Sequence, residues 1–319
     1  MKYRRIGDTE LEASEIGLAV WPLCTDAWRG SDEEALALLR KAYDLGVNFF
    51  DTADVDGRGK GEELLGRAFG GTRDMVVLAT KVGYDFYSDP AANGVSGSRR
   101  LDADYVRHAV DRSLERLGTS FIDLLQVHDP TMEAVQDDAV WQTLEALRGE
   151  GKIRYFGAAL GPDVGHHDEG VLAMRKRFAT TLSIPFNLFE QDPGRKFFTV
   201  ALEYQTGILV RNPHANGVLD DGAAVRAGGY YPPRSEGWAR EALAKRGSLE
   251  WIRKDGMTMG QAALKAYLWE EAVPSVLVEA SDAAKLEEFC EAPDKRDFAR
   301  EEIAELAEQY RRNFDVPRS

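Results

Sequence analysis

The sequence is poor in cysteine and has no long uninterrupted run of hydrophobic residues. Its two cysteines, Cys24 and Cys290, lie far apart in a chain of 319 residues, which excludes the cysteine-dense framework of small secreted domains. No apolar run is long enough to span a bilayer. The first residues, MKYRRIGDTELEAS, lack the apolar core of a secretory signal. We therefore expect a cytoplasmic protein with free thiols.

Positive charge is also scarce. The 40 Lys and Arg residues are outnumbered by 54 Asp and Glu residues, and the formal net charge is -14. This balance disfavours nucleic acid and anionic membranes as partners. The sequence also lacks internal repeats, low-complexity tracts and stretches typical of flexible linkers. Residues 1–319 are therefore expected to form one domain, whose oligomeric state the sequence does not determine.

Short apolar runs alternate with amphipathic helical segments along the chain. Residues 1–14 are expected to form a hairpin, and a helix is expected from the Ser31/Glu34 capping box to Gly46. A long polar loop is expected over 83–100. Eight strands are expected at residues 15–19, 47–50, 75–80, 121–127, 152–157, 180–186, 206–210 and 274–278. Eight strand–helix units predict an α/β fold of the (β/α)8 TIM-barrel type with an N-terminal β-hairpin.

Polar residues stand at the ends of three successive predicted strands. Asp51, Lys81 and His128 each follow a buried apolar run. The carboxyl ends of barrel strands meet at one face, so these side chains are expected to converge in one pocket, with Asp51 paired to Lys81. Taken singly, each residue could be an ordinary polar residue after a strand. Together they favour a catalytic site, because an ion pair beside an imidazole can tune a proton donor.

The sequence around these three residues resembles the aldo-keto reductase family. The matching stretches are DTADV at 51–55, EELLG at 62–66, ATKVG at 79–83, DLLQVH at 123–128 and GKIRYFG at 151–157. The resemblance covers nearly the whole chain and implies the family barrel, with a hairpin closing its bottom. It also implies reduction of a small aldehyde or ketone by NADPH or NADH. In that reaction Asp51 and Lys81 would lower the pKa of the proton donor, and His128 would orient the substrate carbonyl.

Asp56 occupies the position of the family's catalytic tyrosine. The reference pKa of an aspartate is about 3.9, so beside Lys81 the Asp56 carboxyl is expected to be ionised and a poor acid at neutral pH. The neighbouring carboxylates of Asp51 and Asp54 would instead raise the pKa of Asp56. Tyr84 or Tyr87, in the loop after Lys81, could supply a substitute phenol. The plain structural alternative is that Asp56 only caps or solvates its loop.

Three functions are therefore open on sequence grounds. The first is a divergent NAD(P)H-dependent reductase in which Asp56, a water or a loop tyrosine gives the proton. The second is a non-redox lyase, dehydratase or epimerase, with Asp56 and His128 as base and acid and Lys81 stabilising an anion. The third is a catalytically inactive binding protein. The resemblance favours the reductase, although fold analogy does not establish activity.

The coenzyme positions implied by the resemblance are only partly kept. After the last strand, Glu279 and Ser281 stand where the family grips the 2′-phosphate. Lys285 and Phe289 occupy the positions of the adenine ligands. Lys285 could replace part of the missing positive charge, whereas Glu279 would repel a phosphate. Tight NADPH binding is therefore not expected.

Other coenzyme contacts come from strands five to seven. Either Ala159-Leu160 or Ala158-Ala159 matches the Ser-Asn pair that holds the nicotinamide amide in the family, and Ser183 matches its glutamine. Asn187, Arg211 and Asn212 are the remaining candidates, because the last loops of a barrel commonly bind phosphate. We expect these three residues to contribute to an anion or coenzyme site.

The first loop and a few further motifs complete the sequence expectations. Trp21 and Trp28 of that loop, together with Tyr84, are expected to line the substrate pocket. Cys24 is expected to be a small core residue rather than a nucleophile. No metal site is assigned, because residues 52–63 depart from the calcium-loop pattern and residues 166–169 are expected to begin an exposed helix.

Overall fold

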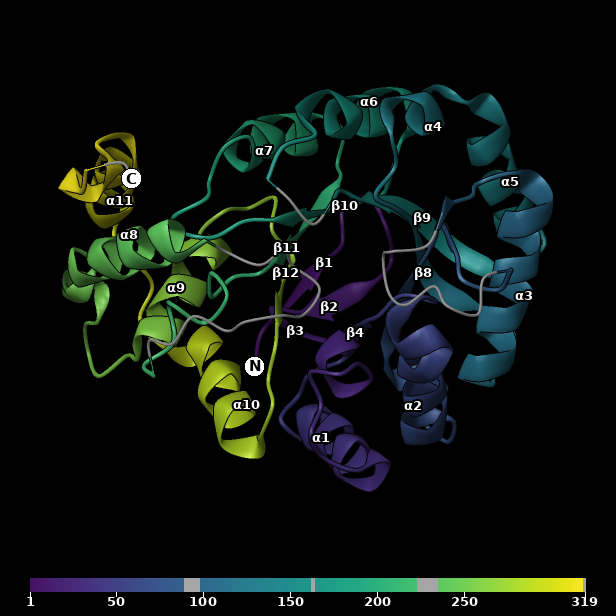
Figure 1. Ribbon diagram of the computed structural model, residues 1–319, viewed down its shortest axis with the longest axis horizontal. Coiled ribbons are helices and arrows are strands. Elements are labelled where there is room, and N and C mark those ends of the chain that lie inside the picture. Colours follow the sequence, from purple (N-terminus) through teal and green to yellow (C-terminus); the bar gives the residue numbers. More distant parts are fainter. Residues whose placement is uncertain (89–97, 162–163, 223–234, 318–319) are drawn as a thin grey trace.

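The computed structural model describes residues 1–88, 98–161, 164–222 and 235–317, and a closed barrel of parallel strands lies at its centre (Figure 1). The strand order around the barrel is β10-β11-β12-β3-β4-β5-β8-β9. The strands are β3 (Ile16–Ala19), β4 (Phe49–Asp51), β5 (Val77–Val82), β8 (Ile122–His128), β9 (Ile153–Ala159), β10 (Thr181–Pro185), β11 (Gly207–Arg211) and β12 (Ser275–Val278). The predicted (β/α)8 barrel is thus confirmed.

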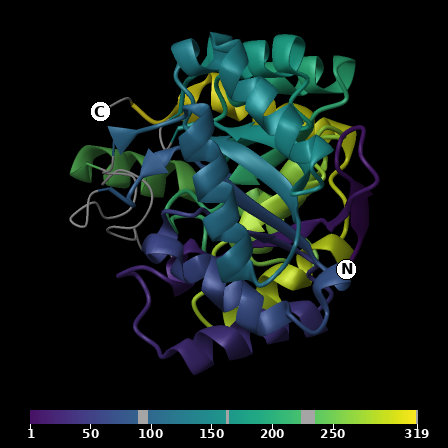
Figure 2. The same ribbon diagram turned by 90° about the vertical axis from the view of Figure 1, so that its right-hand side faces the viewer.

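Helices surround the barrel, as the two perpendicular views show (Figures 1 and 2). They are α1 (Asp32–Asp44), α2 (Lys60–Phe69), α3 (Ala103–Leu117), α4 (Met132–Gln136), α5 (Asp138–Gly149), α6 (His167–Arg177), α7 (Gly194–Glu203), α8 (Glu236–Gly247), α9 (Met259–Leu268), α10 (Ala283–Cys290) and α11 (Arg300–Arg311). The predicted capping box of α1 is present, with the Ser31 side chain accepting from the Glu34 backbone N–H. None of the described helices is both long and apolar enough to cross a membrane.

Alternation along the strands separates two apolar layers. Leu18 and Phe50 belong to the large core between strands and helices, whereas Phe49, Leu124 and Leu209 belong to a smaller cluster inside the barrel. Successive side chains of a strand point to opposite faces, which explains this division. The interior cluster is apolar, and Asp51, Lys81 and His128 lie at or near the carboxyl ends of their strands.

The N-terminal hairpin closes the barrel floor, as predicted. β1 (Tyr3–Arg5) pairs antiparallel with β2 (Glu12–Ser14). Ile6 and Leu11, between these strands, are buried in the interior cluster with Phe49 and Leu124. The floor is therefore filled by apolar side chains, and any ligand must enter from the opposite face.

The expected polar loop at 83–100 is wrong at its two ends. β6 (Tyr84–Asp85) pairs antiparallel with β7 (Ser98–Arg99), while residues 89–97 lie outside the described part of the chain. Tyr84 and Phe86 are buried against Ala53 and Val55. This apolar contact, which a polar composition does not reveal, anchors the segment over the loop that follows β4.

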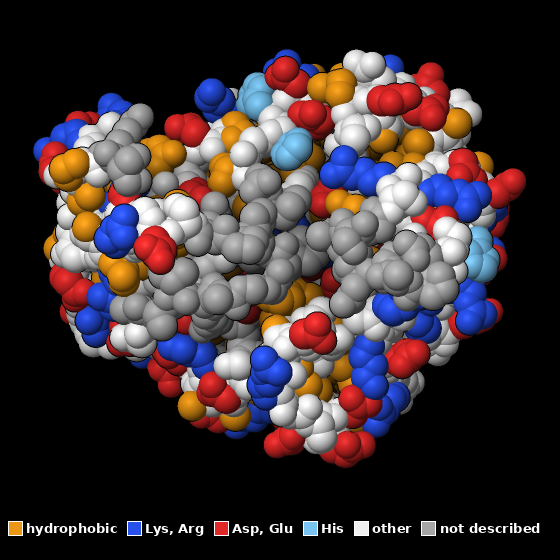
Figure 3. Space-filling model, viewed as in Figure 1, with side chains coloured by type: hydrophobic (Ala, Val, Ile, Leu, Met, Phe, Trp, Pro, Cys, Tyr) orange, Lys and Arg blue, Asp and Glu red, His pale blue; other side chains and the backbone are white. Residues whose placement is uncertain are grey.

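Charged side chains of both signs are interspersed around the periphery of the face shown in Figure 3. Many of them form ion pairs between exposed residues, such as Arg107 with Glu150 and Lys152 with Asp111. Such pairs contribute little to stability because water screens them.

Candidate active site

Asp51 and Lys81 form a buried ion pair at the mouth of the barrel. The Lys81 Nζ donates to Asp51 Oδ2 at 2.5 Å and to the Thr52 carbonyl oxygen at 2.7 Å. The Gln126 Nε2 donates to Asp51 Oδ1 at 3.2 Å, so both carboxylate oxygens are held. Asp51 ends β4, and Lys81 is the penultimate residue of the neighbouring strand β5. The predicted pairing of Asp51 with Lys81 is confirmed.

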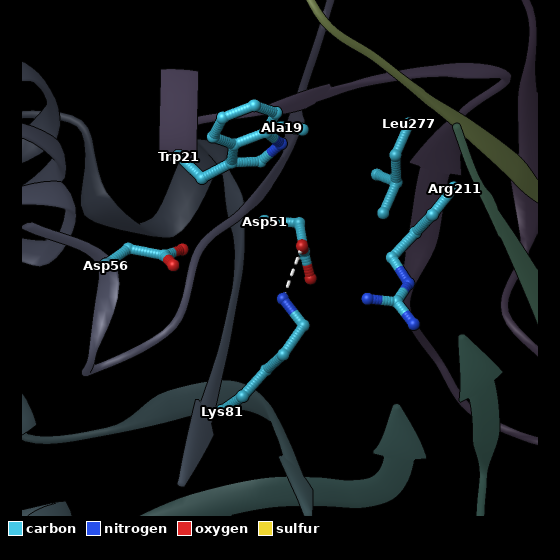
Figure 4. Close-up of a pocket in the computed structure, with 7 residues that line it drawn as sticks. All are labelled: Ala19, Trp21, Asp51, Asp56, Lys81, Arg211 and Leu277. Carbon is cyan, nitrogen blue, oxygen red and sulfur yellow. Dashed lines mark hydrogen bonds and ion pairs between the residues drawn. The ribbon is translucent and has the colours of Figure 1, made fainter. Parts of the chain in front are cut away.

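A pocket opens directly above this ion pair (Figure 4). The ≈ 300 Å³ of space between its walls includes open solvent, and the enclosed cavity measures only ≈ 10 Å³. The lining residues are Ala19, Trp21, Asp51, Asp56, Lys81, Arg211 and Leu277. Figure 4 shows Asp56 and Arg211 on opposite sides of the Asp51–Lys81 pair, with the carboxyl of the one and the guanidinium of the other directed toward it. The pocket is small, polar at its base and apolar along the wall formed by Trp21 and Leu277.

Asp56 is brought into this pocket by the turn that follows the second barrel strand. It begins the short 3-10 helix η2 (Asp56–Gly59), immediately before α2, and is buried. The Thr52 Oγ1 donates to Asp56 Oδ2 at 3.3 Å. The residue at the family's tyrosine position therefore presents its carboxyl group to the Asp51–Lys81 pair.

The expectation that Asp56 is fully ionised at neutral pH is wrong. Burial raises the pKa of Asp56 from its ordinary 3.8 to about 7, against the opposing effect of the Lys81 ammonium and with a further raising contribution from Asp51. Loss of hydration disfavours the charged form of a buried carboxyl. Sequence reasoning weighed the neighbouring charges and missed the burial. At pH 7 this carboxyl is thus poised between its acid and base forms.

His128 ends β8 and is fully buried. Burial, followed by the charges of Lys81, Arg211 and Arg99, holds the pKa of the His128 imidazole well below its usual range. The ring is therefore neutral at pH 7, and one of its nitrogens carries a hydrogen. A neutral imidazole can donate a hydrogen bond to a carbonyl oxygen without adding charge.

Neither loop tyrosine lines the pocket. The Tyr84 hydroxyl donates to Asp129 Oδ2 at 2.7 Å, and its ring packs edge-on against His128 with centroids 5.1 Å apart. Burial, followed by Asp129, raises the pKa of Tyr84 to about 12. The Tyr87 oxygen accepts from Arg116 Nη2 at 2.9 Å. The Tyr84 ring thus packs against His128, and neither phenol is placed to substitute for the missing tyrosine.

The two tryptophans of the first loop are separated. Trp21 lines the pocket. The Trp28 indole Nε1 donates to the Ser31 carbonyl oxygen at 3.0 Å, next to the N-terminus of α1, and Trp28 is not among the pocket-lining residues. The structure therefore supports the prediction that these tryptophans line the substrate pocket only for Trp21.

Arg211, predicted to contribute to an anion or coenzyme site, ends β11 and lines the pocket with Asp51 and Lys81. Gln126, which holds Asp51, was missed altogether. A signal for it exists, because Gln126 stands two residues before His128 and so shares the inward face of β8.

The other predicted coenzyme residues are engaged within the protein. Asn187 Oδ1 accepts from the backbone N–H groups of Phe189 and Glu190 at 3.0 and 3.1 Å, which closes a turn. Asn212 Oδ1 accepts from the Asn216 N–H at 2.8 Å. These contacts stabilise the loops after β10 and β11. Both amide side chains are therefore already hydrogen-bonded within the protein.

The adenosine end of the expected coenzyme path is also internally satisfied. The Lys285 Nζ donates to Glu288 Oε2 at 2.9 Å within α10. The Ser281 hydroxyl contacts Asp282 Oδ2 at 3.4 Å, and Phe289 is buried against the ring of His214 with centroids 4.2 Å apart. Lys285 therefore reaches a phosphate only after giving up its carboxylate partner.

The nicotinamide end fits a coenzyme better. The Ser183 hydroxyl is fully buried and has no hydrogen-bond partner among the described residues. By strand alternation Ser183 faces the barrel interior, and it is paired in register with Ala159, which in turn is opposite His128. A buried unsatisfied hydroxyl suits the carboxamide of a nicotinamide. Within the described chain, no cluster of three or more His, Cys, Asp or Glu residues is arranged to hold a metal ion.

Comparison with known proteins identifies the class. Residues 15–311 match the model of the aldo/keto reductase family. The chain is 31% identical over 320 residues to the uncharacterized oxidoreductase YqkF of Bacillus subtilis, covering 96% of this chain and 95% of that protein. It is 28% identical over 329 residues to L-glyceraldehyde 3-phosphate reductase of Escherichia coli, covering 96% and 91% of the two chains.

Solved structures agree with this class. The holo form of aldo-keto reductase AKR11C1 from Bacillus halodurans superimposes with a TM-score of 0.81 at 28% identity, covering 97% of this chain and 96% of that chain. The chain thus belongs to the aldo/keto reductase family of oxidoreductases, whose members generally use NAD(P)H.

Proposed function

We propose that this protein is an NAD(P)H-dependent reductase of small aldehydes or ketones in which Asp56 is the proton donor. One observation carries the proposal. The Asp56 carboxyl shares a pocket with the buried Asp51–Lys81 pair, and its pKa lies at about 7. A general acid works best when its pKa is near the operating pH. The name of the Escherichia coli relative, a reductase of a phosphorylated aldehyde, supports a carbonyl substrate.

Asp51, Lys81 and Asp56 have different roles in the proposed proton transfer. Asp51 and the Thr52 carbonyl hold the Lys81 ammonium, which keeps a positive charge beside the reacting oxygen. This charge favours the developing alkoxide and also lowers the pKa of Asp56 from the higher value that burial alone would give. Protonated Asp56 can then give its proton to that oxygen. The Asp56 carboxylate that remains is stabilised by the positive charge of Lys81.

His128 and Ser183 position the reactants. The neutral His128 ring can donate a hydrogen bond to the substrate carbonyl and polarise it. The buried Ser183 hydroxyl would hold the carboxamide of a nicotinamide. A reduced nicotinamide supplies the hydride when it is bound. The weak point is the phosphate end of the coenzyme path, where Lys285 is paired with Glu288.

Two substitutions at Asp56 test the assignment. Asp56→Asn keeps the shape of the side chain but cannot exchange a proton, so kcat for NADPH-dependent aldehyde reduction should fall by about 10²-fold or more. Asp56→Tyr should also lose activity, because the larger ring does not fit the position of the buried carboxyl. Asp54→Asn is the matched control, since Asp54 is equally buried but does not line the pocket, and it should retain activity.

The outcomes separate the alternatives. A gain of activity in Asp56→Tyr would show that the native residue is a defect rather than the acid. Unchanged activity in Asp56→Asn would show that Asp56 only shapes its loop. Tryptophan fluorescence that does not respond to either coenzyme would contradict the reductase and favour a non-redox reaction by the same side chains.

A further inference from the structure

The segment that follows β5 is packed directly against His128. Gly83, the first residue of this segment, adopts a φ of +151°. A Cβ added to Gly83 would lie 3.0 Å from the His128 carbonyl oxygen and 3.4 Å from the His128 Cβ. The backbones at the ends of β5 and β8 are therefore in contact, which leaves little room for a residue larger than glycine. Tyr84 comes next in the chain and lies beside the imidazole.

The rings of Tyr84 and His128 are perpendicular, with their centroids 5.1 Å apart. This is one of the arrangements that aromatic rings prefer. Both side chains are buried. Tyr84 is also covered by Arg99, its register partner in β7, whose guanidinium lies over the Tyr84 ring at 5.8 Å from the centroid. The Tyr84 ring therefore forms one wall of the space that the imidazole occupies.

Two hydrogen bonds hold Tyr84 in place. Its hydroxyl donates to Asp129 Oδ2 at 2.7 Å, and its backbone carbonyl oxygen accepts from the Tyr105 hydroxyl at 2.6 Å. Burial, followed by Asp129, raises the pKa of Tyr84 to about 12, so the phenol keeps its hydrogen and remains the donor. All three residues are buried, and water is largely kept from competing for these bonds. The Tyr84 ring is thus fixed at both its backbone and its hydroxyl.

Asp129, which directly follows His128, has an unusual conformation. Its φ is +45°, a left-handed backbone that aspartate tolerates better than most residues. Its N–H donates to the Ala159 carbonyl oxygen at 2.8 Å. Its Oδ1 is buried and has no hydrogen-bond partner among the described residues, whereas Oδ2 accepts from Tyr84. A strained backbone and an unsatisfied buried oxygen both cost free energy, and such features are concentrated at functional sites.

We propose that Tyr84 and Asp129 are positioning residues that fix the orientation of the His128 imidazole. The inference rests on the proposed reduction, in which His128 polarises the substrate carbonyl. A neutral imidazole donates from only one of its nitrogens, so this hydrogen bond requires one orientation of the ring. The perpendicular Tyr84 ring resists rotation of the imidazole, and Asp129 holds the Tyr84 ring. Neither residue is among those that line the pocket, so both act through His128.

Substitutions at the two residues separate the ring from its hydrogen bond. Tyr84→Leu removes the ring and should lower kcat for aldehyde reduction by about tenfold or more, with the coenzyme Kd unchanged, because small displacements of a catalytic group are costly. Tyr84→Phe keeps the ring, so the loss should be only about threefold. Asp129→Gly removes the acceptor without straining the backbone and should match Tyr84→Phe. Asp129→Asn keeps an acceptor and tolerates positive φ, so it should recover most of the activity that Asp129→Gly loses.

Double-mutant cycles test whether the effect passes through His128. In a His128→Ala background, Tyr84→Leu should change kcat by less than about twofold, because the imidazole that Tyr84 orients is absent. An equal loss with and without the imidazole would overturn the proposal. Tyr155→Phe is the matched control, because the Tyr155 hydroxyl accepts from the Glu10 N–H at 3.3 Å at the barrel floor, and this variant should keep its kcat. Thermal melting of each variant checks that it folds.

A measurement without turnover keeps this proposal separate from the proposed function. In protein labelled with ¹⁵N in its histidine side chains, the His128 signals are those lost in His128→Ala. The native protein should show one sharp pair of His128 ring-nitrogen resonances, as expected for one orientation and one tautomer. In Tyr84→Leu these resonances should broaden or shift, and native-like resonances there would overturn the positioning role. Altered resonances, with no reduction of any aldehyde by the native protein, would support the positioning role and contradict the reductase.

Discussion

Asp54 and Asp56 lie two residues apart on one loop, and burial raises the pKa of both. Their neighbours differ. Asp56 is close to Lys81, whose charge opposes burial and leaves the pKa at about 7. Asp54 lies near the Glu62 carboxylate, and its oxygens have no hydrogen-bond partner among the described residues, so its pKa is raised well above the ordinary range. Asp56 therefore titrates near neutral pH, whereas burial and the Glu62 carboxylate both favour the protonated form of Asp54 by raising its pKa.

This difference predicts the pH dependence of the reaction. If Asp56 is the proton donor, as proposed, carbonyl reduction needs its protonated form, so kcat should be constant below about pH 7 and should fall as pH rises through that value. Alcohol oxidation, the reverse reaction, needs the carboxylate and should rise over the same range. Steady-state rates in both directions provide the measurement, with Asp54→Asn expected to keep the same midpoint. Parallel profiles in the two directions would be inconsistent with Asp56 as the proton-transfer group.

At the scale of elements, the turn η2 decides where Asp56 points. Gly57 adopts a φ of +56°, and a Cβ added to it would lie 2.0 Å from the Cys24 carbonyl oxygen. The turn after β4 is therefore packed directly on the first loop, and no residue with a side chain fits there without movement. Cys24 contributes its backbone to this contact, and burial, followed by Asp56, raises the pKa of its thiol. This agrees with a packing role and not with a nucleophile.

A glycine substitution should therefore disturb catalysis through Asp56. In Gly57→Ala the backbone must shift, both because of the clash and because alanine disfavours positive φ. We expect kcat to fall by about tenfold or more, since a displaced general acid loses much of its contribution. Gly71→Ala is the control, because a Cβ there meets nothing within 4 Å. Equal rates in the two variants, measured with one aldehyde and NADPH, would argue against a role for the turn.

At the scale of the whole molecule, the barrel concentrates its polar groups at one end. Ile6 and Leu11 fill the floor, and Phe49, Leu124 and Leu209 fill the interior above it. The mouth contains the ion pair, Asp56 and Arg211. The proposed coenzyme path runs from this mouth toward α10, where Lys285, predicted to bind the coenzyme, is paired with Glu288. On this proposal the reaction end of the path is better formed than its phosphate end.

Coenzyme affinity should reflect this asymmetry. We expect NADPH to bind with a Kd weaker than about 10 μM, which corresponds to at most about 7 kcal/mol. Glu288→Gln should release Lys285 and tighten NADPH more than NADH, because only NADPH carries the 2′-phosphate. Glu287→Gln on the same helix, where Glu287 pairs with Lys41, should change neither. Titration of tryptophan fluorescence measures both affinities, and sub-micromolar NADPH binding by the native protein would be incompatible with this account.

Much of the architecture was accessible from local patterns. Apolar runs ending in polar residues predicted the barrel strands, and the Ser31/Glu34 pair predicted the start of α1. The Asp51–Lys81 pair followed from the geometry of parallel strands, whose carboxyl ends meet whatever lies between them in sequence. These features depend on periodicity and hydrogen-bonding rules that act over a few residues, or on topology that the order of elements implies.

The character of the site depended on the tertiary structure. The pKa of Asp56 depends on how deeply its carboxyl is buried and on its contacts with Thr52 and Lys81. The sequence predicts Arg211 to contribute to an anion or coenzyme site, and the folded chain shows that it lines the same pocket as Asp51 and Lys81. The desolvation of a group and the direction of its side chain both depend on many neighbours that are distant in the chain. Local sequence therefore determined the barrel and its ion pair, whereas the packed structure decided the charge state and the facing of the groups that meet a substrate.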